Sequence, residues 1–321
     1  MNRILRVRPK AGLQPFLADG EVVAFNVGPE GHVYLVIALR PLDYRVAQPG
    51  WAIFPKTEPD QAQKYRVIAL SGDRPILDVI IERERFNIHD VQPLGDDLLL
   101  VCARSHYRGP KDFDKNGRVY TRGGKFLREM LLGDGIQSVQ ATSKGKIWTG
   151  FFDEGVFGNF GWEEPVGESG LVAWNPKGKK VYAFQPPKGL DAICHCYALN
   201  VESEEDVWCH YDGEIPLVHI HRNKVKSFWK VPGGGSDAFA VSKGRVLFRG
   251  GDGERDWYSL FSLEDAGQTK EGAKIQLQGP DGNNLIAEWA AGRGDAIHLI
   301  GGGSLYRIDV QSVKDVPETS G

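Results

Sequence analysis

Ionisable and aromatic side chains recur at two kinds of position in this 321-residue sequence. The first is the short segment in front of a predicted strand, which holds His89, Asp90, Asp191 and Asp237. The second is the segment that follows the next strand along. It holds Arg104, His106, Tyr107, Phe152, Asp153, Glu154, His210, Asp212 and Arg249. Arginine and aromatic side chains dominate binding hot spots, so this pattern predicts a ligand-binding surface. For the aspartates of the first set, the alternative is that they cap free backbone N–H groups near strand starts.

A calcium-loop pattern is present in part. Asp112, Asp114 and Asn116, followed by Gly117, match the opening D-x-[DN]-x-[DN]-G. The bidentate acid that should close the loop is missing, because Gly123 stands at that position. Lys-Asn-Gly is also a good hairpin turn by itself. We therefore expect either no cofactor or a divalent cation, with calcium as the candidate.

Other catalytic and metal signatures are weaker. Cys194-His195-Cys196 and Cys209-His210 carry soft-metal ligands, but the cysteine spacing is too short for a typical zinc site. The sequence contains no G-x-S-x-G, H-E-x-x-H or phosphate-binding loop motif. No residue is therefore assigned a catalytic role.

A repeating unit must position these side chains. Each copy has a short strand, a polar turn with glycine or an acid, and a second strand that starts with an aliphatic residue or Trp. Glycine suits such turns because a tight hairpin needs positive φ. The copies cover residues 22–35, 88–101, 136–148, 196–208, 237–248 and 285–299. Each continues into two more strand-like runs, and four strands per unit at about 40–60 residues are typical of β-propeller blades.

The repeat predicts an all-β fold, a single closed β-propeller of six blades in one domain, residues 1–321. The blades are expected at roughly 20–85, 86–133, 134–188, 189–233, 234–279 and 280–312. The last copy is one strand short, and residues 3–8 are expected to close it and remove an exposed edge. The long first copy leaves a seventh blade within residues 40–85 open. A β-sandwich is the alternative fold, although it requires no sequence repeat.

Propeller geometry places the two sets of side chains together. The segment that enters the innermost strand and the segment that leaves the second strand emerge on the same face, so both line one channel mouth. The turn tips on the other face, such as 143–145 and 242–244, are expected to be plain solvated hairpins. We call the channel mouth that the two sets of side chains line the decorated mouth. A Gly-rich, acidic insertion at residues 158–168 contains Trp162 and lies at this mouth. Long loops are usually functional, so it is expected to form a lid, or alternatively to plug the mouth or cover a neighbouring blade.

Composition limits the partners and the location. The net charge is −3, so there is no basic excess for nucleic-acid binding. No stretch approaches the roughly 18 apolar residues of a membrane-spanning helix, and the first residues lack a signal-peptide core. With four cysteines, the sequence predicts a soluble, cytoplasmic protein with reduced thiols.

One blade carries a family resemblance. The sequence has DGIQSV at 134–139, SKGKIWTG at 143–150 and EGV at 154–156. This pattern resembles the repeat of two-component regulator propellers and the blades of virginiamycin B lyase-like propellers. Val207-Trp208 is the best second match. The resemblance implies a blade in which Trp fills the space between neighbouring sheets. It implies no activity, because the catalytic His and Glu of the lyase are not in recognisable motifs.

Three functions remain open from the sequence. The first is a recognition propeller that binds a small polar molecule, a glycan or a peptide at the decorated mouth. The second is a lyase or hydrolase in which mouth carboxylates and histidines hold a divalent cation. The third is a protein–protein scaffold with an apolar rim at residues 151–162. Fold alone does not decide among them.

Overall fold

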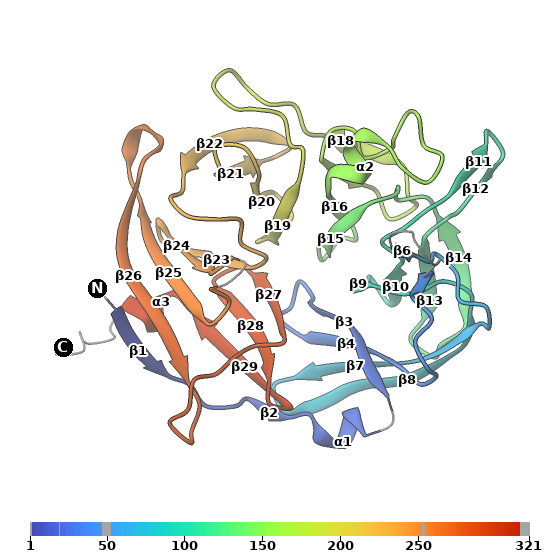
Figure 1. The fold of residues 1–321 in the computed structure, drawn as a ribbon, viewed down its shortest axis with the longest axis horizontal. Coiled ribbons are helices and arrows are strands. Elements are labelled where there is room, and N and C mark those ends of the chain that lie inside the picture. The colour runs from blue at the N-terminus through green and yellow to red at the C-terminus, as the bar shows by residue number, and fades with distance from the viewer. Residues whose placement is uncertain (1, 19, 47–52, 252–253, 315–321) are drawn as a thin grey trace. The chain divides into compact units, whose positions relative to one another are not determined.

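The computed structural model describes residues 2–18, 20–46, 53–251 and 254–314. It divides the chain into two compact units. Unit 2 comprises residues 17–184, and unit 1 comprises residues 1–16 and 185–321. Figure 1 labels most of the elements of both units.

Unit 2 contains three four-stranded antiparallel sheets in chain order. The first consists of β3 (Glu21–Val27), β4 (Val33–Ala38), β7 (Gln63–Ser71) and β8 (Arg74–Glu84). The second consists of β9 (Asp90–Leu94), β10 (Asp97–Val101), β13 (Gly117–Thr121) and β14 (Phe126–Met130). The third consists of β15 (Ile136–Ala141), β16 (Ile147–Phe151), β17 (Leu171–Trp174) and β18 (Lys180–Ala183). Smaller additions are the pairs β5 (Arg45–Val46) with β6 (Phe54–Pro55) and β11 (Tyr107–Gly109) with β12 (Asp112–Phe113), and helix α2 (Asp153–Phe157).

Unit 1 repeats this plan. Its first sheet consists of β19 (Cys196–Val201), β20 (Asp206–Tyr211), β21 (Pro216–His221) and β22 (Lys224–Lys230). Its second contains β23 (Phe239–Ser242), β24 (Arg245–Arg249), β25 (Trp257–Leu263) and β26 (Thr269–Gln278). Its third contains β27 (Trp289–Arg293), β28 (Ala296–Gly301) and β29 (Ser304–Asp309). The N-terminal segment adds β1 (Asn2–Arg6) and β2 (Ala11–Gly12), and short helical turns lie at α1 (Gln14–Leu17), η1 (Asp265–Gly267) and α3 (Val310–Lys314).

Six blades, three in each unit, make the fold an all-β, six-bladed β-propeller, as the repeat predicted. Among the described residues, the region 40–85 forms no seventh four-stranded sheet, since β7 and β8 complete the first blade. Within the same residues, none of the helices has the length and apolar composition needed to cross a membrane.

The N-terminal segment closes the last blade, but with different residues from those expected. Ala11 and Gly12 pair with Leu305 and Ser304 of β29. Residues 2–6 instead form β1, which lies parallel to β26 and makes the second sheet of unit 1 five-stranded (Figure 1). Leu5 packs on the core there, alongside the buried residue Val7. The long strand β26 pairs with β25 along one edge, and β1 pairs along its other edge. The alternating apolar pattern of the N-terminal segment does not show which sheet edge the segment will pair with.

The core lies between successive sheets of each unit. In unit 2, Val36 of the first sheet and Leu100 of the second share one buried cluster, and Leu99 and Val139 share the next. In unit 1, Trp208 lies in a cluster with Phe239 and Phe261 of the following sheet. The central strands are apolar on both faces because both faces are covered. Trp208 thus fills the space between neighbouring blades, as the repeat pattern suggested.

One asparagine in each unit links the three inner strands. The Asn26 side chain, on β3, donates to Asp90 at 2.6 Å and to the Val139 carbonyl at 2.8 Å. The Asn200 side chain, on β19, donates to the carbonyl of Phe239 at 3.0 Å and to that of Gly294 at 2.9 Å. A buried carboxamide satisfied on both sides fixes the register of strands that share no ladder with each other.

Candidate functional site

Three of the predicted residues, Arg104, Phe152 and Glu154, lie together. Arg104 follows β10 and is 3% exposed. Its Nη1 donates to the carboxylate of Glu154 on α2. Its Nη2 lies 2.9 Å from Oδ2 of Asp134, in the segment that enters β15. The ring centroids of Phe160 and Phe152 lie 4.1 Å and 5.2 Å from the guanidinium carbon. We call these five residues the Arg104 cluster.

The Arg104 cluster is electrostatically unbalanced. Nε and Nη2 of Arg104 are buried without a hydrogen-bond partner, so the contact with Asp134 is an ion pair that lacks hydrogen-bond geometry. Burial raises the pKa of Asp134 to about 6, although Arg104 and the Ser105 N–H act to lower it. The charge of Glu154 raises this pKa further. The single positive charge of Arg104 is therefore shared by the carboxylates of Asp134 and Glu154. Of these two, only Glu154 is substantially exposed.

The insertion after α2 packs onto the segment that follows β10. The Tyr107 N–H donates to the Phe160 carbonyl at 2.8 Å, and the Trp162 indole donates to the Ser105 carbonyl at 2.8 Å. Gly161 lies between these contacts with φ at +85°, and an added Cβ would stand 2.1 Å from the Tyr107 oxygen. Only glycine fits this approach. The insertion thus covers the neighbouring blade of unit 2, which was the alternative to a lid.

An open hollow of about 560 Å³ lies beside this contact. We call it the exit hollow. The Tyr107 ring is 4.8 Å from Trp162 and 6.5 Å from Phe113, centroid to centroid, so an aromatic cluster supports it. The residues that line the hollow are Tyr107, Arg108, Gly161, Trp162, Glu163 and Glu164.

His106 and Asp153 flank the Arg104 cluster. The His106 ring, with 42% of its side chain exposed, lies 4.2 Å from the Phe160 ring, and its Nδ1 is 3.4 Å from the Thr57 hydroxyl. Asp153 is exposed and accepts a hydrogen bond from the Glu154 N–H at 2.9 Å. Asp153 therefore supports the first turn of α2, whereas the His106 ring remains partly exposed at the surface.

The calcium candidate has its side chains engaged elsewhere. Arg108 contacts Asp112 at 2.9 Å and Asp114 at 2.7 Å. The hydrogen bonds from Arg108 and from the backbone and side chain of His106 hold the pKa of Asp114 low, at about 2, against the effect of burial. The Asn116 amide donates to the carbonyls of Cys102 and Gly133. These oxygens do not converge, so the residues do not fit a calcium ion.

His89 and Asp90 belong to the framework of unit 2. Asp90 accepts hydrogen bonds from Asn26 and from the N–H groups of Val91 and Val139, and burial raises its pKa to about 7. His89 accepts from the Ala103 N–H at 3.2 Å, and burial lowers its pKa to about 4. Both side chains therefore make hydrogen bonds within the framework of unit 2.

Two of the unit 1 candidates share a hollow. Asp191 and Asp212 line a space of about 210 Å³, together with Glu214 and Lys230. Asp212 also accepts hydrogen bonds from the N–H groups of Cys194 and His195, at 3.0 and 2.9 Å. That carboxylate therefore shapes the segment entering β19.

The remaining unit 1 candidates do not present a binding surface. His210 is 1% exposed, contrary to the surface position expected for it. Burial lowers its pKa to about 4, and its Nδ1 lies 3.1 Å from the Pro216 carbonyl. Both faces of β20 are buried, so this side chain lies in the core whichever face it points to. Arg249 is also buried, and it pairs with Asp237 at 3.0 Å.

No described set of three or more His, Cys, Asp or Glu side chains converges as a metal site would. Cys102, Cys194, Cys196 and Cys209 form no disulfide. The metal-dependent reading required such a convergence at the decorated mouth, and it gains no support from the described part of the chain.

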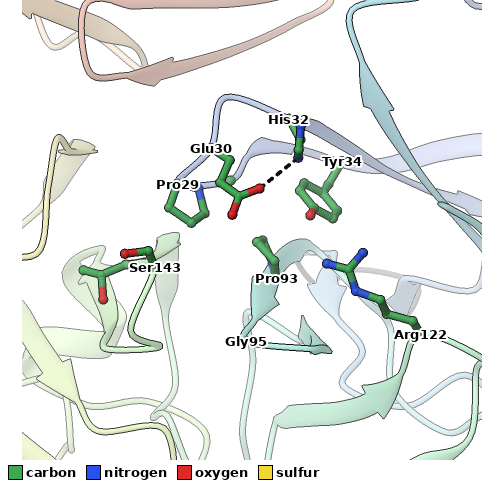
Figure 2. A pocket seen from close by; sticks show the side chains of 10 residues that line it. Pro29, Glu30, His32, Tyr34, Pro93, Gly95, Arg122 and Ser143 are labelled. Carbon is green, nitrogen blue, oxygen red and sulfur yellow. Dashed lines mark ion pairs between the residues drawn. The ribbon is translucent and has the colours of Figure 1, made fainter. Parts of the chain in front are cut away.

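Sequence reasoning missed two features. Phe160 belongs to the Arg104 cluster but lies in an irregular loop. Such a loop has no periodic sequence pattern that would predict which of its side chains make contacts. A small hollow also lies among the hairpin turns of unit 2, where plain solvated tips were expected (Figure 2). The arginine of this hollow, Arg122, lies in the turn between β13 and β14. The repeated turns between the first and second strands of the blades do not predict its position.

Comparison with known proteins gives two partial likenesses. The sequence model of the YxzG family matches residues 172–308, which is less than half of the chain. Among solved structures, the chain is similar to the WD40 β-propeller domain of Doa1, with 12% identity. That likeness covers 90% of this chain and 92% of that one, with a TM-score of 0.44. A search of curated proteins finds no match.

Proposed function

We propose that this protein is a non-catalytic recognition propeller that binds a polar ligand, a glycan or a peptide, in the exit hollow of unit 2. The observation that carries the proposal is a hollow of about 560 Å³ whose walls are held by hydrogen bonds before any ligand arrives. The Tyr107 N–H and the Trp162 indole hold these walls. A site that is already ordered loses little entropy on binding.

The lining chemistry suits a polar ligand with a flat or aliphatic part. The Tyr107 ring offers a face for a sugar ring or an aliphatic side chain. Glu163 and Glu164 are exposed, and neither has an ion-pair partner among the described residues. Their carboxylates would accept hydrogen bonds from sugar hydroxyls, peptide N–H groups or an ammonium group. Arg108 is already paired with Asp112 and Asp114, so the hollow is acidic overall.

Two other readings have less support. A scaffold would need an apolar rim at residues 151–162, yet Phe151 and Trp162 are buried and only Phe157 is strongly exposed, at 68%. A metal-dependent enzyme would need converging metal ligands, and no group of three or more His, Cys, Asp or Glu side chains among the described residues is placed to hold a metal ion. The cytoplasmic location and the likeness to two-component regulator or lyase-like blades stay predictions.

The test is binding of the purified full chain to glycan and peptide arrays. We expect a small set of binders whose signal falls about tenfold or more in Tyr107→Ala and in the double variant E163Q/E164Q, as truncation of a hot-spot residue does. Phe126→Leu is the matched control, because Phe126 is an exposed aromatic of the same unit that does not line the hollow. Binders that are retained by both hollow variants, or an array without binders, would overturn the proposal.

A further inference from the structure

The small hollow at the turn end of unit 2 is a separate feature from the exit hollow. Three hairpin turns between first and second strands border it, namely β3–β4 through Gly28 and Glu30, β9–β10 through Gly95, and β15–β16 through Ser143. Arg122 reaches it from the turn between β13 and β14 (Figure 2). An inner strand enters at one end and turns at the other, so the two hollows lie at opposite ends of the sheets.

The size of the turn-end hollow restricts what it can hold. Its volume is about 50 Å³. A water molecule takes about 30 Å³ in the liquid, and pockets for drug-sized ligands are about 300–1,000 Å³. The space therefore suits one compact polar group and excludes a sugar ring or a nucleobase.

The walls are fixed by close packing. A Cβ at Gly28 would lie 2.9 Å from the Tyr34 ring and 3.0 Å from Pro93, so these three residues already touch. Tyr34 is almost fully buried, and Pro93 belongs to the neighbouring blade. A hollow enclosed by three hairpins and two rigid rings keeps its shape without a ligand.

The charges in the turn-end hollow favour an anion at one side. Arg122 is exposed, and no carboxylate of the described chain lies within ion-pair distance of it. Figure 2 shows its guanidinium directed toward the Tyr34 ring. Burial raises the pKa of the Tyr34 hydroxyl, with Arg122 opposing, so the phenol keeps its proton. Glu30 instead pairs with His32, at 3.5 Å.

We propose that the turn-end hollow binds one small oxyanion group, a carboxylate or a phosphate, with Arg122 supplying the charge and the Tyr34 hydroxyl a hydrogen bond. Arginine presents paired donors that match both groups. Glu30 weakens the binding of an anion, because its own negative charge lies at the same opening. This site is independent of the function proposed for the exit hollow.

The experiment is a nuclear magnetic resonance titration of the full chain with inorganic phosphate and, separately, with acetate, at constant ionic strength set with chloride. The backbone amides of Gly28, Gly95 and Ser143 are followed. We expect saturable shifts with at least one probe, and the stronger of the two identifies the oxyanion. Arg122→Gln should weaken binding about tenfold or more, as loss of a charge-assisted hydrogen bond does.

Two further variants make the result specific. Glu30→Gln should tighten binding about two- to fivefold, because a nearby like charge is removed. Arg245→Gln is the matched control, since it removes the same charge from a hairpin of unit 1 and should change nothing. Absence of saturable shifts with both probes, or equal affinity in the wild type and Arg122→Gln, would overturn the proposal. Thermal unfolding of each variant checks that the fold is retained.

Discussion

Arg104 and Arg249 are two buried arginines that can be compared between the units. Arg249 is the last residue of β24, the second strand of the second sheet in unit 1, whereas Arg104 lies three residues after the corresponding strand β10 of unit 2, and each is almost fully buried. Each also reaches the segment that enters the next sheet. Arg104 lies 2.9 Å from Asp134, and Arg249 donates to the Ala287 carbonyl at 2.6 Å.

The partners of the two arginines differ in kind. Arg249 uses all three nitrogens, which donate to Asp237, to the Arg255 carbonyl and to the Ala287 carbonyl. Arg104 has two nitrogens without hydrogen-bond partners and holds two phenyl rings and two carboxylates instead. A buried arginine near the end of this strand therefore acts as a structural tie in unit 1 and as a support for a surface loop in unit 2.

The largest effect is expected from Arg249→Ala. It leaves a buried backbone acceptor without its donor, and removing one partner of a buried charged group costs about 3–5 kcal/mol. The free energy of unfolding, measured by denaturant titration, should fall by about that amount. Arg245→Ala on the same strand is the control and should change it by about 1 kcal/mol or less. A small loss for Arg249→Ala would remove the distinction between the arginines.

A pH-dependent effect is expected from Arg104→Gln. Arg104 lowers the pKa of Asp134, which burial already holds near 6, so this pKa should rise when the cation is removed. A buried acid with a raised pKa binds its proton more tightly in the folded state, so stability is lost as pH rises. The destabilisation should grow from about 1 kcal/mol near about pH 5 to about 3 kcal/mol near about pH 8.

Arg249→Gln provides the contrast for that measurement. Two of the partners of Arg249 are backbone carbonyls, which do not titrate. Its loss of stability should therefore change less with pH than that of Arg104→Gln. An equal slope for the two variants would show that Asp134 does not depend on Arg104 for its charge.

The smallest effect is expected from Phe160→Leu. The ring of Phe160 lies over Arg104, and a cation–π contact contributes about 1 kcal/mol. The global stability should hardly change, but the insertion should open more often. Hydrogen exchange at the Tyr107 amide, which donates to Phe160, should become about fivefold faster, and exchange at Val119 should stay the same. Unchanged exchange at Tyr107 would show that the insertion is held by other contacts.

The sequence predicted the six blades because each hairpin needs a polar turn with glycine or an acid. These turn residues recur along the chain at the spacing of the blades. It also grouped Arg104, Phe152 and Glu154, since consecutive blades repeat the same strand ends. It could not choose the face of β20 to which His210 points, because both faces of this strand are buried. Nor could it find Phe160, whose position depends on the fold of an irregular loop.

The pairing of the first strands has a consequence for the order of assembly during synthesis. Residues 2–6 pair with residues 274–278, and residues 11–12 pair with residues 304–305. The ribosome must therefore produce all of unit 2, and almost all of unit 1, before the first residues find their partners. Closing so long a segment carries an entropic cost, although that cost grows only slowly with length. Unit 2 contains all its own strands and can mature first, so the start of the chain is the last part to settle.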